Sequence, residues 1–195
     1  MNVSRLREFD RADVVTKALN LFWSDGYNAS SISKLIDVMG INRGSLYATF
    51  RNKASLFSEA MSNFTKSSWD FDSAKMVGID DPLQDIRGFY YSIFLSDGET
   101  ISNGCLLFNT VSELSNTLPE VAVEARDHLL ELKALFLNRL TDARDNGMID
   151  MEKDLDVQAD YLLAMMAGLH TLSKMDFDRA SLKKVIDTTM DGLFS

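Results

Sequence analysis

The stretch INRGSLYATF, residues 41–50, places four polar side chains close together. They are one arginine and three hydroxyl-bearing residues, namely Arg43, Ser45, Tyr47 and Thr49. A guanidinium forms paired hydrogen bonds with a phosphate or a guanine edge, and hydroxyl groups bind phosphate oxygens. A helix that only faces solvent usually carries Glu and Lys at such positions. The residue types therefore indicate a surface that binds a polyanion.

Neighbouring residues extend this chemistry. Gly44 has no side chain, so the backbone there can approach a ligand closely. The free amides at a helix N-terminus attract phosphate. Ser31 offers a further hydroxyl and Lys53 a further cation.

Helices must position these groups, because apolar residues recur at helical spacing along the chain and strand-like alternation is absent. The N-terminal part predicts four helices, at about residues 10–25, 31–40, 42–50 and 52–69. Asp10 is the expected cap of the first, Ser30 or Ser31 of the second, and Asn42 of the third.

The second and third helices, joined by a tight turn at Gly40, form a candidate helix-turn-helix. In such a unit the second helix enters the major groove of DNA. We then expect Arg43, Gly44, Ser45 and Thr49 to face bases, and Ser31, Tyr47 and Lys53 to anchor phosphates. A generic helical corner would have a similar pattern, so the residues alone leave both interpretations open.

Beyond the weakly patterned residues 72–81, the sequence predicts five more helices. They begin at Pro82, near Gly104, at Pro119, after Asp156 and after Ser181. The fold class is therefore all-α, with about nine helices. We expect a DNA-binding domain at residues 1–53 and a ligand-binding and dimerisation domain at residues 54–195.

Composition and charge fit this organisation. Of the 195 residues 46% are hydrophobic, and the formal net charge is −9. Residues 1–66 hold nine Lys and Arg against six Asp and Glu, whereas the remainder holds eleven against twenty-three. A basic region on an acidic chain can bind a polyanion locally. A single cysteine and the lack of a secretion signal or a membrane-spanning run predict a soluble, cytoplasmic protein.

Residues 25–57, DGYNASSISKLIDVMGINRGSLYATFRNKASLF, resemble the DNA-binding head of the TetR family of bacterial repressors. Those heads read as a glycine- or aromatic-bearing turn, a hydroxyl pair, a short helix, and Gly-Val-Ser-Lys-Gly-Thr-Leu-Tyr followed by Phe, Lys and Leu. Ala48 and Thr49 stand where many members have histidine or tyrosine, which leaves the base preference open.

The resemblance implies a three-helix head, a fourth helix that joins it to a ligand-binding body, and repression of transcription. The implied partners are a second copy of the chain, a pseudo-palindromic double-stranded DNA operator and a small-molecule effector. No cofactor is implied. Residues 156–175 and 181–194 match the last two helices of the family, which build the dimer interface, although their apolar stripes also fit an ordinary core.

A ligand pocket is expected between helices of the body. Its candidate residues are Trp69, Phe89, Tyr90, Phe94, Phe108, Met165 and Met166, with Asn109 and His170 as polar contacts. Each of them also fits a plain core position.

Cys105 is a candidate sensor, because a helix N-terminus lowers the pKa of a thiol and favours the reactive thiolate. Residues 98–114, GETISNGCLLFNTVSEL, resemble the matching segment of N-ethylmaleimide-responsive family members, in which a cysteine is the sensor. Those members carry a lysine near the end of the penultimate helix, and Lys174 corresponds to it. The alternative is a small buried apolar residue.

Other classes of protein fit less well. A di-iron enzyme needs two Glu-x-x-His pairs, and the chain has two histidines, neither with a glutamate three residues before it. No phosphate-binding glycine loop and no nucleophile elbow occur. We expect neither catalysis nor a metal site. A helical adaptor that binds only protein remains the alternative.

Overall fold

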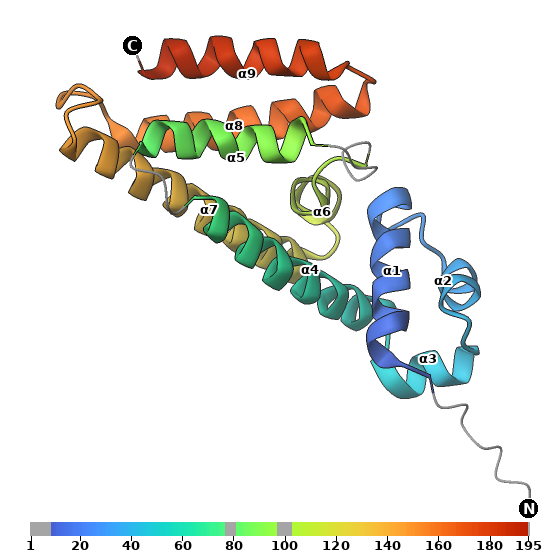
Figure 1. Cartoon of the computed structure of the whole chain (residues 1–195). Helices are drawn as coiled ribbons and strands as arrows, with labels where there is room; N and C mark the ends of the chain where they lie inside the picture. The colour runs from blue at the N-terminus through green and yellow to red at the C-terminus, as the bar shows by residue number, and fades with distance from the viewer. Residues whose placement is uncertain (1–8, 77–80, 97–102, 195) are drawn as a thin grey trace, which may run out of the picture. The chain divides into compact units, whose positions relative to one another are not determined.

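The computed structural model describes residues 9–76, 81–96 and 103–194, without the side chains of residues 69–75 and 194. The described residues form nine α-helices and no β-strand, which confirms the predicted fold class (Figure 1). The helices are α1 Arg11–Asp25, α2 Ile32–Met39, α3 Arg43–Phe50, α4 Lys53–Lys75, α5 Pro82–Phe94, α6 Leu106–Leu114, α7 Pro119–Asp145, α8 Leu155–Lys174 and α9 Arg179–Phe194. Within these ranges, none of the helices combines the length and the apolar character that crossing a membrane requires.

The chain divides into two compact units. The first comprises Met1–Ser67 and Thr110–Val123, and the second comprises Ser68–Asn109 and Glu124–Ser195. Helix α6 therefore begins in the second unit and ends in the first. The domain boundary predicted after residue 53 concerns function, and it stays a prediction.

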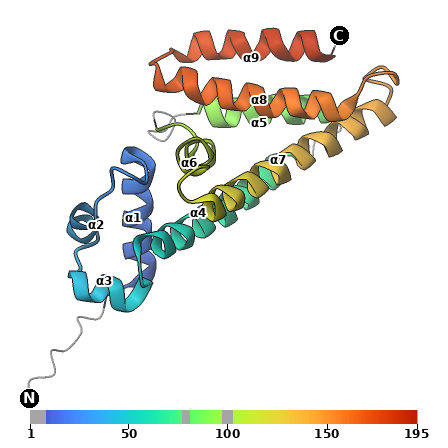
Figure 2. The same cartoon turned by 180° about the vertical axis from the view of Figure 1, so that it is seen from behind.

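The first unit is built around α1, which packs against α2, while α2 packs against α3 (Figure 2). Helix α1 begins as predicted, because the Asp10 carboxylate accepts the backbone N–H groups of Ala12 and Asp13. The buried ring of Phe22 lies 4.8 Å from that of Phe57 on α4, edge to face. This aromatic contact holds the start of α4 against α1.

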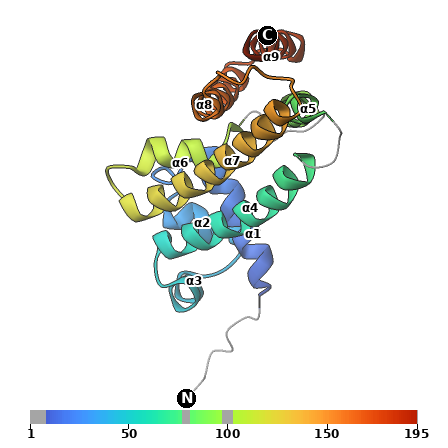
Figure 3. The same cartoon turned by 90° about the vertical axis from the view of Figure 1, so that its left-hand side faces the viewer.

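In the second unit α5, α8 and α9 pack against one another, and Figure 3 shows α8 and α9 nearly end-on. The core of this unit is centred on Phe136 of α7. Its ring lies 5.7 Å from that of Phe89 and 5.8 Å from that of Tyr90, both on α5. All three side chains are buried, so aromatic packing between α5 and α7 contributes to the stability of this core.

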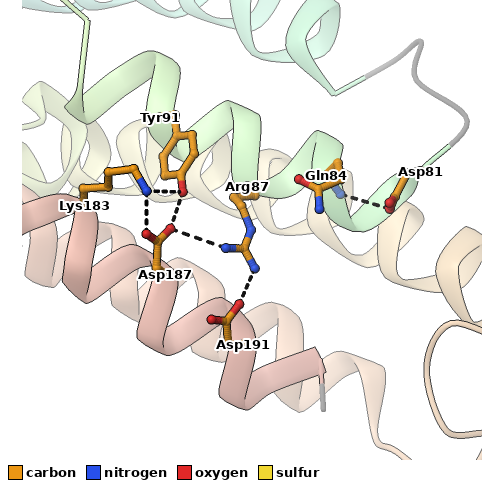
Figure 4. Close-up of polar contacts among 7 residues, drawn as sticks. All are labelled: Asp81, Gln84, Arg87, Tyr91, Lys183, Asp187 and Asp191. Atoms are coloured by element: carbon orange, nitrogen blue, oxygen red, sulfur yellow. Dashed lines mark hydrogen bonds and ion pairs between the residues drawn. The ribbon is translucent and has the colours of Figure 1, made fainter.

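A polar cluster on the surface joins α5 to α9 (Figure 4). Arg87 of α5 donates to Asp191 at 2.5 Å and to Asp187 at 3.4 Å. The hydroxyl of Tyr91 also donates to Asp187, and Lys183 donates to the same carboxylate at 2.6 Å. Asp187 is thus the centre of the cluster that holds α9 on α5.

Three predicted helix starts differ from the observed ones by two or three residues. Helix α8 is capped by Asp154 rather than Asp156, because the Asp154 carboxylate accepts the N–H of Asp156 itself. Helix α9 starts at Arg179, since Asp178 accepts the N–H of Ser181 at 2.8 Å. Helix α6 begins at Leu106 rather than near Gly104. In the first two cases an upstream aspartate reaches the free amides before the predicted cap.

Candidate nucleic-acid interface and sensor site

Two caps and a glycine fix the corner between α2 and α3. Ser31 begins α2, and its Oγ accepts the N–H of Lys34 at 3.2 Å. Helix α2 ends at Gly40, whose φ of 67° is a left-handed conformation that glycine adopts without strain. Asn42 begins α3, and its Oδ1 accepts the N–H of Ser45 at 2.8 Å. The predicted helix-turn-helix geometry is thus confirmed, with Ser31 as the cap of α2.

Helix α3 has a buried face and an exposed face. Leu46 and Phe50 are buried, as their spacing predicts. Arg43, Gly44 and Tyr47 are exposed on the other face, Tyr47 to 43%. The exposed face of α3 therefore presents a guanidinium, uncovered backbone and a phenol to solvent.

Ser45 does not belong to this exposed face. It is 3% exposed, so the prediction that its hydroxyl faces bases is wrong. Ser45 and Thr49 lie one turn apart on the flank next to Leu46, and Thr49 is half-buried. The helical period therefore turns Ser45 inward, whereas the ten-residue pattern alone suggested that all the polar residues share one face.

The structure gives a second reason for a glycine at position 44, which the sequence alone did not reveal. A Cβ atom at this position would lie 3.2 Å from Oδ1 of Asn42, the atom that caps α3. The missing side chain therefore keeps the cap in place and also leaves the backbone uncovered.

Lys53, an expected phosphate contact, is half-buried at the start of α4. Its Nζ lies 4.2 Å from the centre of the Tyr27 ring, an attractive cation–π geometry. Burial lowers the pKa of Lys53, and the charge of Glu113 opposes that effect.

Arg51 is an exposed cation next to α3 that no sequence motif indicated. It directly follows α3, with a positive φ of 65°, and its N–H donates to the carbonyl of Tyr47. Two other cations of this unit are held by carboxylates. Arg11 forms two 2.7 Å bonds to Glu59, and Lys34 lies 2.7 Å from Asp25.

The structure brings three of the sensor candidates together. Cys105 immediately precedes α6, and its carbonyl accepts the N–H of Asn109 at 3.0 Å. Cys105 thus occupies the cap position of α6, whereas the sequence predicted that it lies in the first turn of the helix. Lys174, at the end of α8, donates to Oδ1 of Asn109 at 3.1 Å. A Cβ atom on Gly104 would lie 3.0 Å from Cε of Lys174, so the lysine side chain runs past the residue next to the cysteine.

His170 lies one turn before Lys174 on α8. Its ring is 4.8 Å from that of Phe94 and 6.4 Å from that of Phe108. Burial, together with the charge of Lys174, lowers the pKa of His170 to about 4. The imidazole is therefore neutral at physiological pH. Its Nδ1 is buried without a hydrogen-bond partner among the described residues.

The remaining pocket candidates lie in the core of the second unit. Phe89, Tyr90 and Met166 are buried, and Met165 packs against the same core. The Tyr90 hydroxyl donates to the carbonyl of Leu162 at 2.6 Å. The side chain of Trp69 lies outside the described residues. Contact of these residues with a ligand stays a prediction.

Family models match both parts of the chain. Residues 14–60 match the model described as "Bacterial regulatory proteins, tetR family". Residues 86–189 match that described as "Tetracyclin repressor-like, C-terminal domain". The second match alone covers more than half of the chain.

Full-length relatives agree with this assignment. The uncharacterised HTH-type transcriptional regulator YezE of Bacillus subtilis is 27% identical, over 98% of this chain and 100% of its own. The HTH-type transcriptional repressor ComR of Escherichia coli is 22% identical over 95% of this chain and 90% of its own length.

Solved structures share the fold. A cysteine mutant of the TetR family regulator CifR, complexed with 26-bp operator DNA, is 23% identical over 96% of this chain and 98% of its own, with a TM-score of 0.84. The reduced form of Escherichia coli NemR is 17% identical over 95% of this chain and 97% of its own, with a TM-score of 0.78. Together with the family models and the α2–α3 geometry, these findings show that the chain belongs to the TetR family of DNA-binding bacterial transcriptional regulators.

Proposed function

We propose that this protein is a homodimeric repressor that an effector releases from a pseudo-palindromic operator. The effector is a small molecule held by the second unit or an electrophile that reacts with Cys105. The protein acts by binding rather than by catalysis, and it acts in the cytoplasm, where bacterial DNA lies. Two copies place their α3 helices in successive major grooves, about 34–36 Å apart.

The exposed first turn of α3 carries this proposal. Arg43 has the chemistry to read a guanine edge or to bind a phosphate, and the backbone at Gly44 is not covered by a side chain, so a phosphate can approach it closely. Tyr47 and Ser31 supply hydroxyls for backbone oxygens. Thr49 and Lys53 lie half-buried at the rim, and Ser45 supports the helix from inside.

The test is a fluorescence-anisotropy titration against the DNA directly upstream of the protein's own gene, at two salt concentrations. Arg43→Ala should relax sequence preference by about 1–3 kcal/mol at one base pair, whereas Tyr47→Ala should weaken binding to all sequences alike. Arg51→Ala is the matched control, because it also removes one exposed cation. Equal base preference in the Arg43 variant and the wild type would contradict the placement of α3.

A stripe along α8 supports the homodimer. Its exposed members recur at spacings of four and three residues and are Val157, Tyr161, Ala164, Gly168, Thr171 and Met175. Val157 is 60%, Tyr161 51% and Met175 62% exposed. Apolar and small residues at this spacing suit helix packing against a second copy. Tyr161→Asp should dissociate the dimer in sedimentation experiments, and Leu130→Asp on α7 should not.

The contacts around Cys105 support the electrophile alternative. A thiolate adds to the double bond of N-ethylmaleimide, and a bulky adduct beside Lys174 and Asn109 would disturb the start of α6. One equivalent of the reagent should release DNA from the wild type and leave Cys105→Ser bound. Full binding by the modified wild type would end the sensor hypothesis and direct the search to a non-covalent ligand.

A protein-binding adaptor is the competing function, and the acidic second part of the chain suits it. Salt dependence separates the two. For DNA binding, the logarithm of affinity falls with the logarithm of salt concentration, by about 0.9 per phosphate contact. A flat profile would favour the adaptor.

A further inference from the structure

Glu113, near the end of α6, binds the turn between α1 and α2, residues 26–30. Its Oε2 accepts the backbone N–H of Tyr27 at 2.9 Å, and its Oε1 accepts that of Asn28 at 2.7 Å. One carboxylate thus holds two successive main-chain amides of a segment that precedes it by 85 to 86 residues. Hydrogen bonds to an ionised acceptor are roughly twice as strong as neutral ones.

The turn is shaped to receive this carboxylate. Gly26 has a φ of 83°, which side chains rarely allow, and a Cβ atom there would lie 3.0 Å from Oε2 of Glu113. A larger residue at this position would therefore be strained and would also push the carboxylate away. The glycine permits both the turn and the contact.

The charge of Glu113 has a cationic neighbour. Lys53 lies over the Tyr27 ring, and this ring is 5.2 Å from that of Phe57 and 6.0 Å from that of Phe22. The turn is therefore held from two sides, by the aromatic rings of α1 and α4 and by the carboxylate of α6. All of these residues belong to the first unit.

The turn leads directly into α2 and α3, the helices of the proposed DNA-binding corner. Asn28 precedes Ser31, the cap of α2, by three residues, and α2 leads through Gly40 into α3. We propose that Glu113 is a positioning residue for DNA recognition, which fixes the start of α2 and thereby the presentation of α3. It acts through main-chain amides and does not touch DNA. The inference rests on the proposed function, in which α3 reads DNA.

The direction in which DNA affinity changes on substitution of Glu113 distinguishes a positioning role from simple charge repulsion. Removing a negative charge near a DNA-binding surface raises affinity, because it reduces repulsion of phosphates. Loss of a positioning contact lowers affinity. Glu113→Gln removes the charge and one acceptor together, so its effect on DNA affinity tells which role dominates.

Glu120→Gln is the matched control. Glu120 is exposed in the first turn of α7, belongs to the same unit, and its charge also reaches Tyr27. The probe is a duplex selected from a random-sequence library by the full-length wild-type protein. We expect Glu113→Gln to bind about tenfold more weakly than the wild type, the size of one charged hydrogen bond. Glu120→Gln should bind equally well or slightly more tightly.

Amide hydrogen exchange gives a second readout in the absence of DNA. In Glu113→Gln the amides of Tyr27 and Asn28 should exchange about tenfold faster, while the amide of Leu56, in α4, should keep its wild-type rate. Equal acceleration at all three amides would mean general loss of stability and would overturn the positioning role. Glu113→Asp, which keeps the charge but is one methylene shorter, should behave like Glu113→Gln.

The inference fails if Glu113→Gln binds the duplex as tightly as Glu120→Gln. Failure of the proposed function would look different. In that case the wild-type protein itself would enrich no duplex from the library, whatever the exchange rates at Tyr27 and Asn28.

Discussion

The α2–α3 corner and the helices of the second unit keep their shape in different ways. In the corner, Asn42 and Ser45 are hydrogen-bonded partners three residues apart. In the second unit, Arg139 and Asp85 are ion-paired across 54 residues, and Arg87 and Asp191 across 104. The first arrangement is local, and the second needs the whole chain to be folded.

The difference also decides which charges remain available to a ligand. Arg43 is exposed on the surface of α3, whereas the guanidinium of Arg87 lies between two carboxylates of α9. Local caps free the surface of the corner for recognition. In the second unit the polar groups hold the protein together.

The largest expected effect is loss of the aromatic core of the second unit. Phe136→Ala should lower the free energy of unfolding by about 3–5 kcal/mol, because the rings of Phe89 and Tyr90 lose their central contact. Urea denaturation at fixed protein concentration measures this. Leu130→Ala, an exposed position on the same helix, should change stability by less than about 0.5 kcal/mol. Similar values for both variants would contradict the proposed central role of Phe136.

A smaller effect should appear as pH falls. His170 stays neutral in the folded protein down to its pKa of about 4, whereas in the unfolded chain it takes up a proton below pH 6.5 or so. The unfolded state then binds more protons, so stability declines from about pH 6.5 to about pH 4, by roughly 3 kcal/mol in all.

The asparagine in His170→Asn cannot take up a proton. The free energy of unfolding of this variant should therefore depend less on pH between about pH 4 and pH 6.5 than that of the wild type, whatever the stability of the variant at pH 7. His128→Asn, which removes the other histidine, is the control. Parallel profiles for His170→Asn and the wild type would exclude His170 as the cause. The measurement is urea unfolding at half-unit steps of pH.

Breaking the local cap tests the corner itself. Asn42→Ala should cost about 1 kcal/mol of stability and should also weaken DNA binding, since α3 loses its fixed start. Asn52→Ala is the matched control, because Asn52 accepts the N–H of Ser55 at 2.8 Å at the start of α4. Stability loss should be similar in the two variants. A DNA-binding defect of equal size in both would show that the α3 cap has no special role.

The smallest effect concerns the surface cluster of α5 and α9. Hydrogen bonds from Lys183 and Tyr91 lower the pKa of Asp187. Its contribution is therefore complete above the unfolded pKa of about 4 and is lost as pH falls through the lower folded value. Asp187→Asn should cost about 0.5–1 kcal/mol at pH 7 and less at pH 2, where carboxylates take up protons. Glu152→Gln, an exposed control, should leave thermal unfolding unchanged at both pH values.

Local signals made the corner predictable from sequence. Asp10, Gly40 and Asn42 each act within three or four residues, so residue type and position suffice to predict their roles. The inward turn of Ser45 was predictable from the helical period but was obscured by a run of polar residues. The caps Asp154 and Asp178 were missed because other cap residues follow within three positions.

Contacts between distant segments could not be predicted in this way. Glu113 belongs to an unremarkable helical segment, and its partners are backbone amides, which leave no trace in residue type. Lys174 was selected only through a family resemblance, and its hydrogen bond to Asn109, which lies 65 residues away, was not predicted. Such contacts depend on how helices pack, which no local pattern encodes.

The main-chain character of the Glu113 contact has a consequence for evolution. On the head side the carboxylate requires only a glycine and two amides, so Tyr27, Asn28 and the whole of α3 can change without loss of its partners. A helix α6 that carries Glu113 is therefore compatible with α3 helices of different operator preference. Substitutions in α3 would preserve this contact within the first unit, so a new operator preference can arise without loss of the support that Glu113 gives to the turn.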